Sequence, residues 1–142
     1  MTVSDQVAFL FLSSTSTARL SGVTIRDLTF RGHLIVAEQS YIGGDTILLT
    51  NIRASSPILY LHSDSAAEVE GLSFRNTTGP LLQVKDSDFT CTDACTIEDV
   101  MHEAMGEDAL IHVMNGKFSL TNSKVQRVSV SDPLGLSPLI LL

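Results

Sequence analysis

Five side chains suited to ligand binding stand at alternate positions of short apolar segments: Tyr60, His62, Gln83, Lys85 and His112. An aromatic ring packs against the apolar face of a sugar, and nearby amide, ammonium and imidazole groups orient its hydroxyls. Residues of these types also occur on the solvent-exposed face of sheets that bind nothing, and this second interpretation is the more common one. These five residues form the candidate ligand-binding face.

Three aspartates and two cysteines lie close together in the sequence between residues 86 and 95. Asp86, Asp88 and Asp93 supply the oxygen ligands that Ca²⁺ prefers. Asp-rich turns also arise because Asp bonds its own backbone, and we favour that interpretation. Cys91 and Cys95 can close a small disulfide, which would indicate an oxidising compartment, or remain reduced thiols with Cys95 inside the fold. Both alternatives stay open.

A third chemical signal is the sequon Asn76-Thr77-Thr78, an acceptor sequence for N-glycosylation. We expect Asn76 in an exposed turn, where a glycan would fit a secreted protein.

The elements that must position these residues are repeated along the chain. An apolar residue, a spacer, an apolar residue and a spacer precede Asp, Asn or Gly five times. These anchors are Asp27, Asn51, Gly71, Asp99 and Asn122, at steps of 24, 20, 28 and 23 residues. Self-similarity at this period predicts stacked units that bury apolar faces against their neighbours.

A second series of short apolar runs lies between the first. The runs are rich in β-branched and aliphatic residues and are bounded by Gly, Pro, Ser and Asp, which predicts strands. They cover residues 7–11, 34–37, 58–61, 81–84, 110–113 and 138–141. Because side chains alternate across a strand, the candidate face points outward when the other positions fill the interior. The expected interior pairs are Ala8/Leu10, Ile35/Ala37, Leu59/Leu61, Leu82/Val84, Ile111/Val113 and Leu139/Leu141.

A leucine-rich repeat is the alternative solenoid at this period. It requires a Leu-x-x-Leu-x-Leu framework and a helical stretch in every repeat. Only the segment from Ile97 to Met105 has helical spacing, so we favour the all-β solenoid.

The chain resembles the right-handed parallel β-helix of the pectate-lyase-like superfamily over roughly residues 7–142. The strings that carry the resemblance are Val-Thr-Ile-Arg-Asp-Leu-Thr-Phe (23–30), Val-Glu-Gly-Leu-Ser-Phe-Arg-Asn (69–76) and Phe-Ser-Leu-Thr-Asn-Ser (118–123). The resemblance implies one domain over residues 1–142, an all-β solenoid of about five to six coils. In this fold an Asn or Asp at a bend stacks on its counterpart in the next coil.

Similar proteins include polysaccharide lyases and glycoside hydrolases. The Asn-Thr-Asp, Asp-Asp, Gly-His-Gly and Arg-Ile-Lys strings of polygalacturonases, which supply the paired carboxylates of hydrolysis, do not occur here. We therefore expect no catalytic residue in this chain and keep an enzyme fragment as the alternative function.

Composition and hydropathy limit the classes of partner that we expect for this protein. A net charge of −7 with nine Lys and Arg argues against nucleic acid, which requires a basic face. No apolar run approaches the roughly 18 residues that a membrane-spanning helix needs. The segment from Val7 to Leu12 lacks a basic region before it, so we expect a first strand rather than a signal peptide.

The apolar segment 136–142 would leave a bare coil end exposed. Three arrangements would shield it: adjoining coils of a longer chain, end-to-end self-association, or a different subunit. We expect a structural and binding module of an extracellular or cell-surface protein that contacts extended carbohydrate or protein. Ca²⁺ at Asp86, Asp88 and Asp93 is the one cofactor that the residue types suggest.

Overall fold

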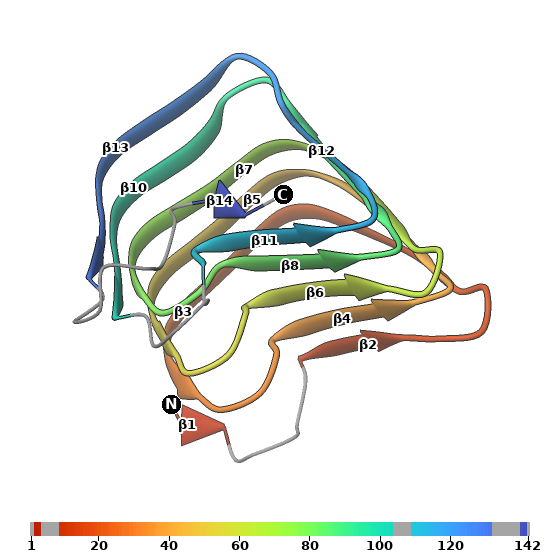
Figure 1. The fold of residues 1–142 in the computed structure, drawn as a ribbon, viewed down its shortest axis with the longest axis horizontal. Helices are drawn as coiled ribbons and strands as arrows, with labels where there is room; N and C mark the ends of the chain where they lie inside the picture. The colour runs from red at the N-terminus through yellow and green to blue at the C-terminus, as the bar shows by residue number, and fades with distance from the viewer. Residues whose placement is uncertain (1, 4–8, 104–108, 132–139, 142) are drawn as a thin grey trace.

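The computed structural model describes residues 2–3, 9–103, 109–131 and 140–141, and every regular element in them is a β-strand (Figure 1). All strand pairs are parallel, and each strand pairs with its counterpart about one repeat away in the sequence. The fold is therefore a parallel β-solenoid of about five coils, and the all-β prediction is confirmed.

Short strands build one side of every coil, and we call them the short-strand sheet. Figure 1 shows the central ones as a row of nearly parallel arrows. Their order is β14-β11-β8-β6-β4-β2. They are β2 (Leu10–Leu12), β4 (Ile35–Glu38), β6 (Leu59–His62), β8 (Leu82–Lys85), β11 (Ile111–Met114) and β14 (Ile140–Leu141).

Longer strands bend around the rest of each coil and form the long-strand sheet (Figure 1). Its main order is β1-β3-β5-β7-β10-β13, with β9 pairing β7 and β12 pairing β9. The first four are β1 (Thr2–Val3), β3 (Thr17–Phe30), β5 (Tyr41–Ala54) and β7 (Ala66–Thr78). In later coils the long strand is divided into β9 (Asp88–Thr92) with β10 (Cys95–Glu103), and β12 (Lys117–Leu120) with β13 (Ser123–Ser131).

Apolar columns fill the solenoid. Leu59 lies between Ile35 and Leu82 in register, and Leu61 and Val84 are completely buried. The expected interior pairs of the four central short strands are therefore confirmed. Because each such side chain leaves water, its burial contributes about 1.5–3 kcal/mol to folding.

The expected register was wrong at both ends of the short-strand sheet. Leu10 pairs with Ile35 and Leu12 with Ala37, so the interior pair there is Leu10/Leu12 rather than Ala8/Leu10. At the other end Ile140, not Leu139, lies beside Ile111. Ala8, Leu139 and most of segment 136–142 lie outside the described residues.

Two corners within each long strand adopt positive φ. The first corner holds Gly22, Thr46 and Gly71, with φ of 61°, 53° and 62°. The strand register aligns the second-corner residues across five coils. They are Asp27, Asn51, Asn76, Asp99 and Arg127.

The predicted anchor column mixed these two corners. Gly71 and Asn122 belong to the first corner, while Asn76 and Arg127 occupy the second. The two corners could not be told apart from residue type, because left-handed backbone favours Gly, Asn and Asp at both of them.

Amide side chains stack at the second corner, as the β-helix resemblance implied. Asn51 Nδ2 donates to Asp27 Oδ1 at 2.5 Å, and Asn76 Nδ2 donates to Asn51 Oδ1 at 3.4 Å. Each bond connects residues of adjacent coils, so the side chains continue the backbone ladder around the bend.

A buried serine ladder marks a third corner, between the short strand and the next long strand. Ser40 N donates to Ser65 Oγ at 3.2 Å, and Ser65 N donates to Ser87 Oγ at 3.0 Å. Ser65 Oγ in turn donates to the His62 carbonyl at 2.8 Å. Ser16 N donates to Ser40 Oγ in the same way, so the ladder crosses four coils.

The segment with helical spacing, Ile97 to Met105, is a strand as far as Glu103, and its last two residues lie outside the described residues. Residues Cys95–Glu103 form β10, which removes the one feature that favoured a leucine-rich repeat. Among the described residues, none belongs to a helix long and apolar enough to cross a membrane.

Replacing Ser65 tests the serine ladder. Ser65→Ala removes the acceptor for Ser40 N–H and the donor to the His62 carbonyl, both in a buried corner. We expect the free energy of unfolding to fall by about 1–3 kcal/mol, the cost of a buried polar group left unpaired.

Denaturant titration measures this change. The matched control is Ser119→Ala, an exposed serine on β12, with an expected change within about 0.5 kcal/mol. Equal effects of the two substitutions would show that the ladder does not stabilise the fold.

Candidate functional site

The short-strand sheet brings the five candidate residues together on its outer surface. Tyr60 pairs with Gln83, and Gln83 pairs with His112. His62 pairs with Lys85 in the neighbouring outward column. Stacked residues are about 4.8 Å apart, so the five side chains form one continuous patch, as the alternation predicted.

Tyr60 is flanked by two imidazoles. Its ring centroid lies 4.7 Å from that of His33 and 4.6 Å from that of His62. The two rings are tilted against the phenol by 34° and 20°. Both imidazoles therefore pack against the Tyr60 ring and reduce the part of it that a sugar could contact.

His33 is a member of this surface that the sequence did not predict. It lies before β4, outside the alternating strand positions, and its Nδ1 is 2.6 Å from the Pro57 carbonyl oxygen. Because a carbonyl only accepts, Nδ1 carries the proton. The alternation of side chains within a strand says nothing about a loop residue that packs on a strand of the next coil. The contact between His33 and Tyr60 is therefore visible only in the folded structure.

Polarity changes along this face. Phe11 and Val36 share the outward column of Tyr60; Phe11 is 58% exposed and Val36 is buried. Lys85 is exposed, and Gln83 and His112 are half-buried. The face is thus apolar at the first coils and polar at the central ones.

The three aspartates do not form one metal site. Asp86 Oδ1 accepts from Asn115 Nδ2 at 2.7 Å, and Asp88 Oδ1 accepts from Lys117 N at 3.0 Å. Asp93 lies beyond the other end of β9, roughly 16 Å along the strand, and accepts from Asn122. Within the described ranges, no group of three or more His, Cys, Asp or Glu side chains could hold a metal ion.

Asp86 and Asp88 instead share a surface hollow with Asp64. Asp64 and Asp86 have φ of 63° and 49°, so both belong to the third corner. This placement agrees with the turn interpretation that the sequence favoured.

Asn76 lies on the surface, at the second corner of β7. Its side chain is exposed and bonds Asn51, and Thr78 of the sequon is exposed as well. Glycosylation at this asparagine stays a prediction.

Cys91 and Cys95 are joined by a disulfide inside the solenoid, with Cα atoms 6.2 Å apart. Cys91 lies beside Val69, and the register places Cys95 beside Leu72. Three residues separate the cysteines, whereas two separate Val69 from Leu72. This corner has two consecutive residues with positive φ, Asp93 and Ala94, where the preceding coils have one. The disulfide therefore bridges a first corner that is one residue longer than in the preceding coils.

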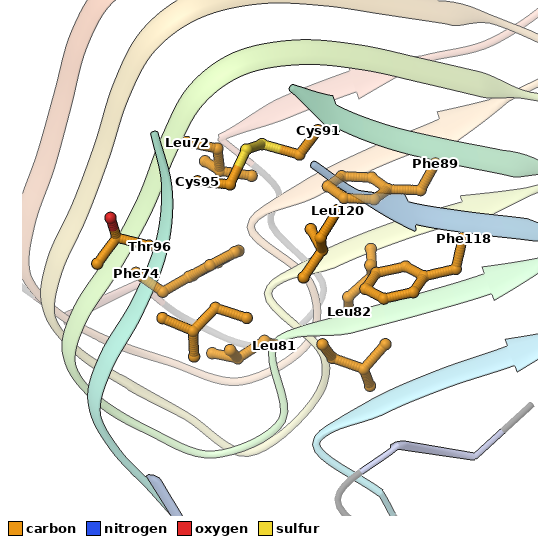
Figure 2. Close-up of a pocket in the computed structure, with 12 residues that line it drawn as sticks. Leu72, Phe74, Leu81, Leu82, Phe89, Cys91, Cys95, Thr96, Phe118 and Leu120 are labelled. Atoms are coloured by element: carbon orange, nitrogen blue, oxygen red, sulfur yellow. A yellow bond between two sulfur atoms is a disulfide. The ribbon is translucent and has the colours of Figure 1, made fainter. Parts of the chain in front are cut away.

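An apolar cavity lies next to this disulfide (Figure 2). Figure 2 shows Phe89, Phe118 and Leu120 on one side of it and Phe74 on the other. The Phe89 and Phe118 rings stack with centroids 5.7 Å apart. Its volume of about 20 Å³ is close to that of one water-sized probe, so it is a packing gap rather than a ligand site.

Charges concentrate at the second corner of the last two long strands. Arg127 Nη2 donates to Glu98 Oε1 at 2.6 Å, and Arg127 Nε donates to Asp99 Oδ1 at 2.5 Å. Hydrogen bonds from Gln126 and then Arg127 lower the pKa of Glu98, and the bond from Arg127 lowers the pKa of Asp99.

Reducing the disulfide tests its contribution. The cross-link closes a short loop, for which the entropy lost by the unfolded chain corresponds to about 2 kcal/mol of stability. We expect protein refolded and titrated with denaturant under strong reductant to be less stable by about that amount. The C91A/C95A double variant is the control and should not respond to reductant; a wild-type protein that is equally insensitive would contradict the expectation.

Acid titration tests the charge cluster. Because the pKa values of Glu98 and Asp99 are lowered by folding, their contribution is present above the unfolded pKa of about 4 and disappears as the pH falls through the folded values. We expect Arg127→Gln to lower the denaturation midpoint at pH 7 and to flatten its decrease below pH ~4.

Arg53→Gln, a substitution of an exposed arginine on β5, is the matched control and should keep the wild-type slope. A parallel pH profile for Arg127→Gln and wild type would show that the cluster does not couple to folding.

Comparison with known proteins supplies no further assignment. No family model, no curated protein and no solved structure matches this chain. The strand register establishes the parallel β-solenoid, while the resemblance to the pectate-lyase-like superfamily is confined to the coil pattern.

Proposed function

We propose that this chain is a rigid solenoid segment that serves as a structural and binding module of an extracellular or cell-surface protein. The observation that carries the proposal is the uninterrupted stacking of the coils. Backbone hydrogen bonds join successive coils in both sheets. Side-chain hydrogen bonds, such as those of Ser65 and Asn51, join the corners of adjacent coils. Such a structure holds flat lateral surfaces in fixed positions, as a recognition module requires.

The disulfide supports the extracellular part of the proposal. Disulfides persist in oxidising compartments and are rare in the cytosol. Cys91 and Cys95 are buried in the core of the solenoid, so their disulfide is part of the packed interior.

The coil ends support a role within a larger assembly. Val125 continues the interior column of Ile97 yet is 50% exposed, and Val128 and Val130 are only partly buried. The β13 strand pairs only with β10 among the described residues. The unpaired outer edge of a long strand is a template for further pairing, so adjoining coils or another copy would cover it.

An enzyme of the pectate-lyase-like superfamily is the second candidate. The observation in its favour is the hollow where Asp64, Asp86 and Asp88 meet. Two of these carboxylates already accept hydrogen bonds from the next coil, which gives them a structural role and places the enzyme second.

A polysaccharide panel separates the two functions. We expect binding of extended carbohydrate without release of reducing ends or unsaturated products, with and without Ca²⁺. Turnover of a polyuronate that is lost in Asp86→Asn or Asp88→Asn, but kept in Asp93→Asn, would establish the enzyme instead. Asn is used because it tolerates the positive φ of Asp86 and Asp93.

A further inference from the structure

The outer surface of the long-strand sheet holds a hollow of about 300 Å³ around Tyr41. Arg19, Glu68, Glu70 and Thr90 line it from neighbouring coils. Tyr41 is 37% exposed, unlike the flanked Tyr60 on the other sheet.

Gly43 provides the space in which the Tyr41 ring lies. It stands between Arg19 and Glu68 in register, at an outward position, yet it is buried. A Cβ at this position would lie 3.0 Å from Tyr41 Cε1 and 3.3 Å from its hydroxyl oxygen. The ring therefore leans across the glycine along the sheet surface, and a side chain at residue 43 would push it away by a few tenths of an ångström.

Polar contacts hold this ring in place. The Tyr41 hydroxyl donates to Glu68 Oε2 at 3.2 Å. Desolvation and then the charge of Glu68 raise the pKa of Tyr41, so the hydroxyl keeps its proton. Arg19 Nη2 lies 3.5 Å from Asp45 Oδ2, and Ser21 donates to the same carboxylate at 2.8 Å. The bond to Glu68 anchors the Tyr41 hydroxyl directly, and the other contacts hold Arg19 and Ser21 beside Asp45.

The residue types indicate which ligand fits. A fixed, exposed ring packs on the apolar face of a pyranose, while carboxylates accept from sugar hydroxyls and a guanidinium donates to them. Asp45, Glu68 and Glu70 outnumber Arg19, so the surface repels anionic chains.

We propose that the Tyr41 hollow is a binding site for neutral hexose units of an extended polysaccharide. This inference rests on the proposed binding role of the solenoid and assigns that role to the long-strand sheet, with Tyr41 as the stacking residue. Gly43 and Glu68 are positioning residues that hold the ring across the sheet.

Isothermal titration with a soluble neutral β-glucan and a soluble mannan tests the site, with polygalacturonate as the anionic comparison. We expect at least one neutral polymer to bind more tightly than polygalacturonate. Tyr41→Ala should weaken that binding by about tenfold or more because it removes the ring, whereas Tyr41→Phe, which keeps the ring, should weaken it by only about two- to threefold. Unchanged circular dichroism and thermal midpoints would show that the variants fold.

Phe11→Ala, which removes an exposed ring from the other sheet, is the matched control and should bind normally. Tyr60→Ala tests the other candidate face: if it loses binding while Tyr41→Ala keeps it, the Tyr41 site is wrong although the proposed binding module survives. If no polysaccharide binds, carbohydrate binding is wrong on both faces. Equal or tighter binding of polygalacturonate would overturn the preference for neutral chains.

Discussion

Parallel backbone pairing between successive coils is the interaction on which this structure depends. Each central long strand exchanges hydrogen bonds with the coil before and the coil after, as β5 does with β3 and β7. A residue therefore cannot shift without misaligning its neighbours on both sides. This constraint explains why the coils tolerate length differences in their turns but keep the same interior columns.

Corners are where this constraint is hardest to satisfy, and the chain meets it in three chemically different ways. Asn and Asp side chains bond one another at the exposed second corner, whereas serines bond backbone amides at the buried third corner. At the first corner the coil with an extra residue contains the Cys91–Cys95 disulfide. In each case the group that bends the chain also links the two sides of the bend or two adjacent coils.

The two lateral surfaces differ in what they offer a ligand. On the short-strand sheet, Tyr60 packs against His33 and His62. On the long-strand sheet, Gly43 leaves room for Tyr41 to lie across the surface, where the side chain is 37% exposed. The two tyrosines thus differ in how much of the ring neighbouring rings cover.

Local residue patterns were enough to predict the strand class, the interior pairs of the central coils and the shared face of Tyr60, Gln83 and His112. These depend on a period of two within one strand, which is local information. It did not determine which corner Gly71 and Asn122 occupy, because two corners five residues apart favour the same residue types.

Three features could be recognised only from the packing of the coils: the serine ladder, the separation of Asp93 from Asp86, and the placement of Tyr41 over Gly43. Each depends on which residues of different coils lie side by side, and that register is set by the stacking of whole coils rather than by any single segment.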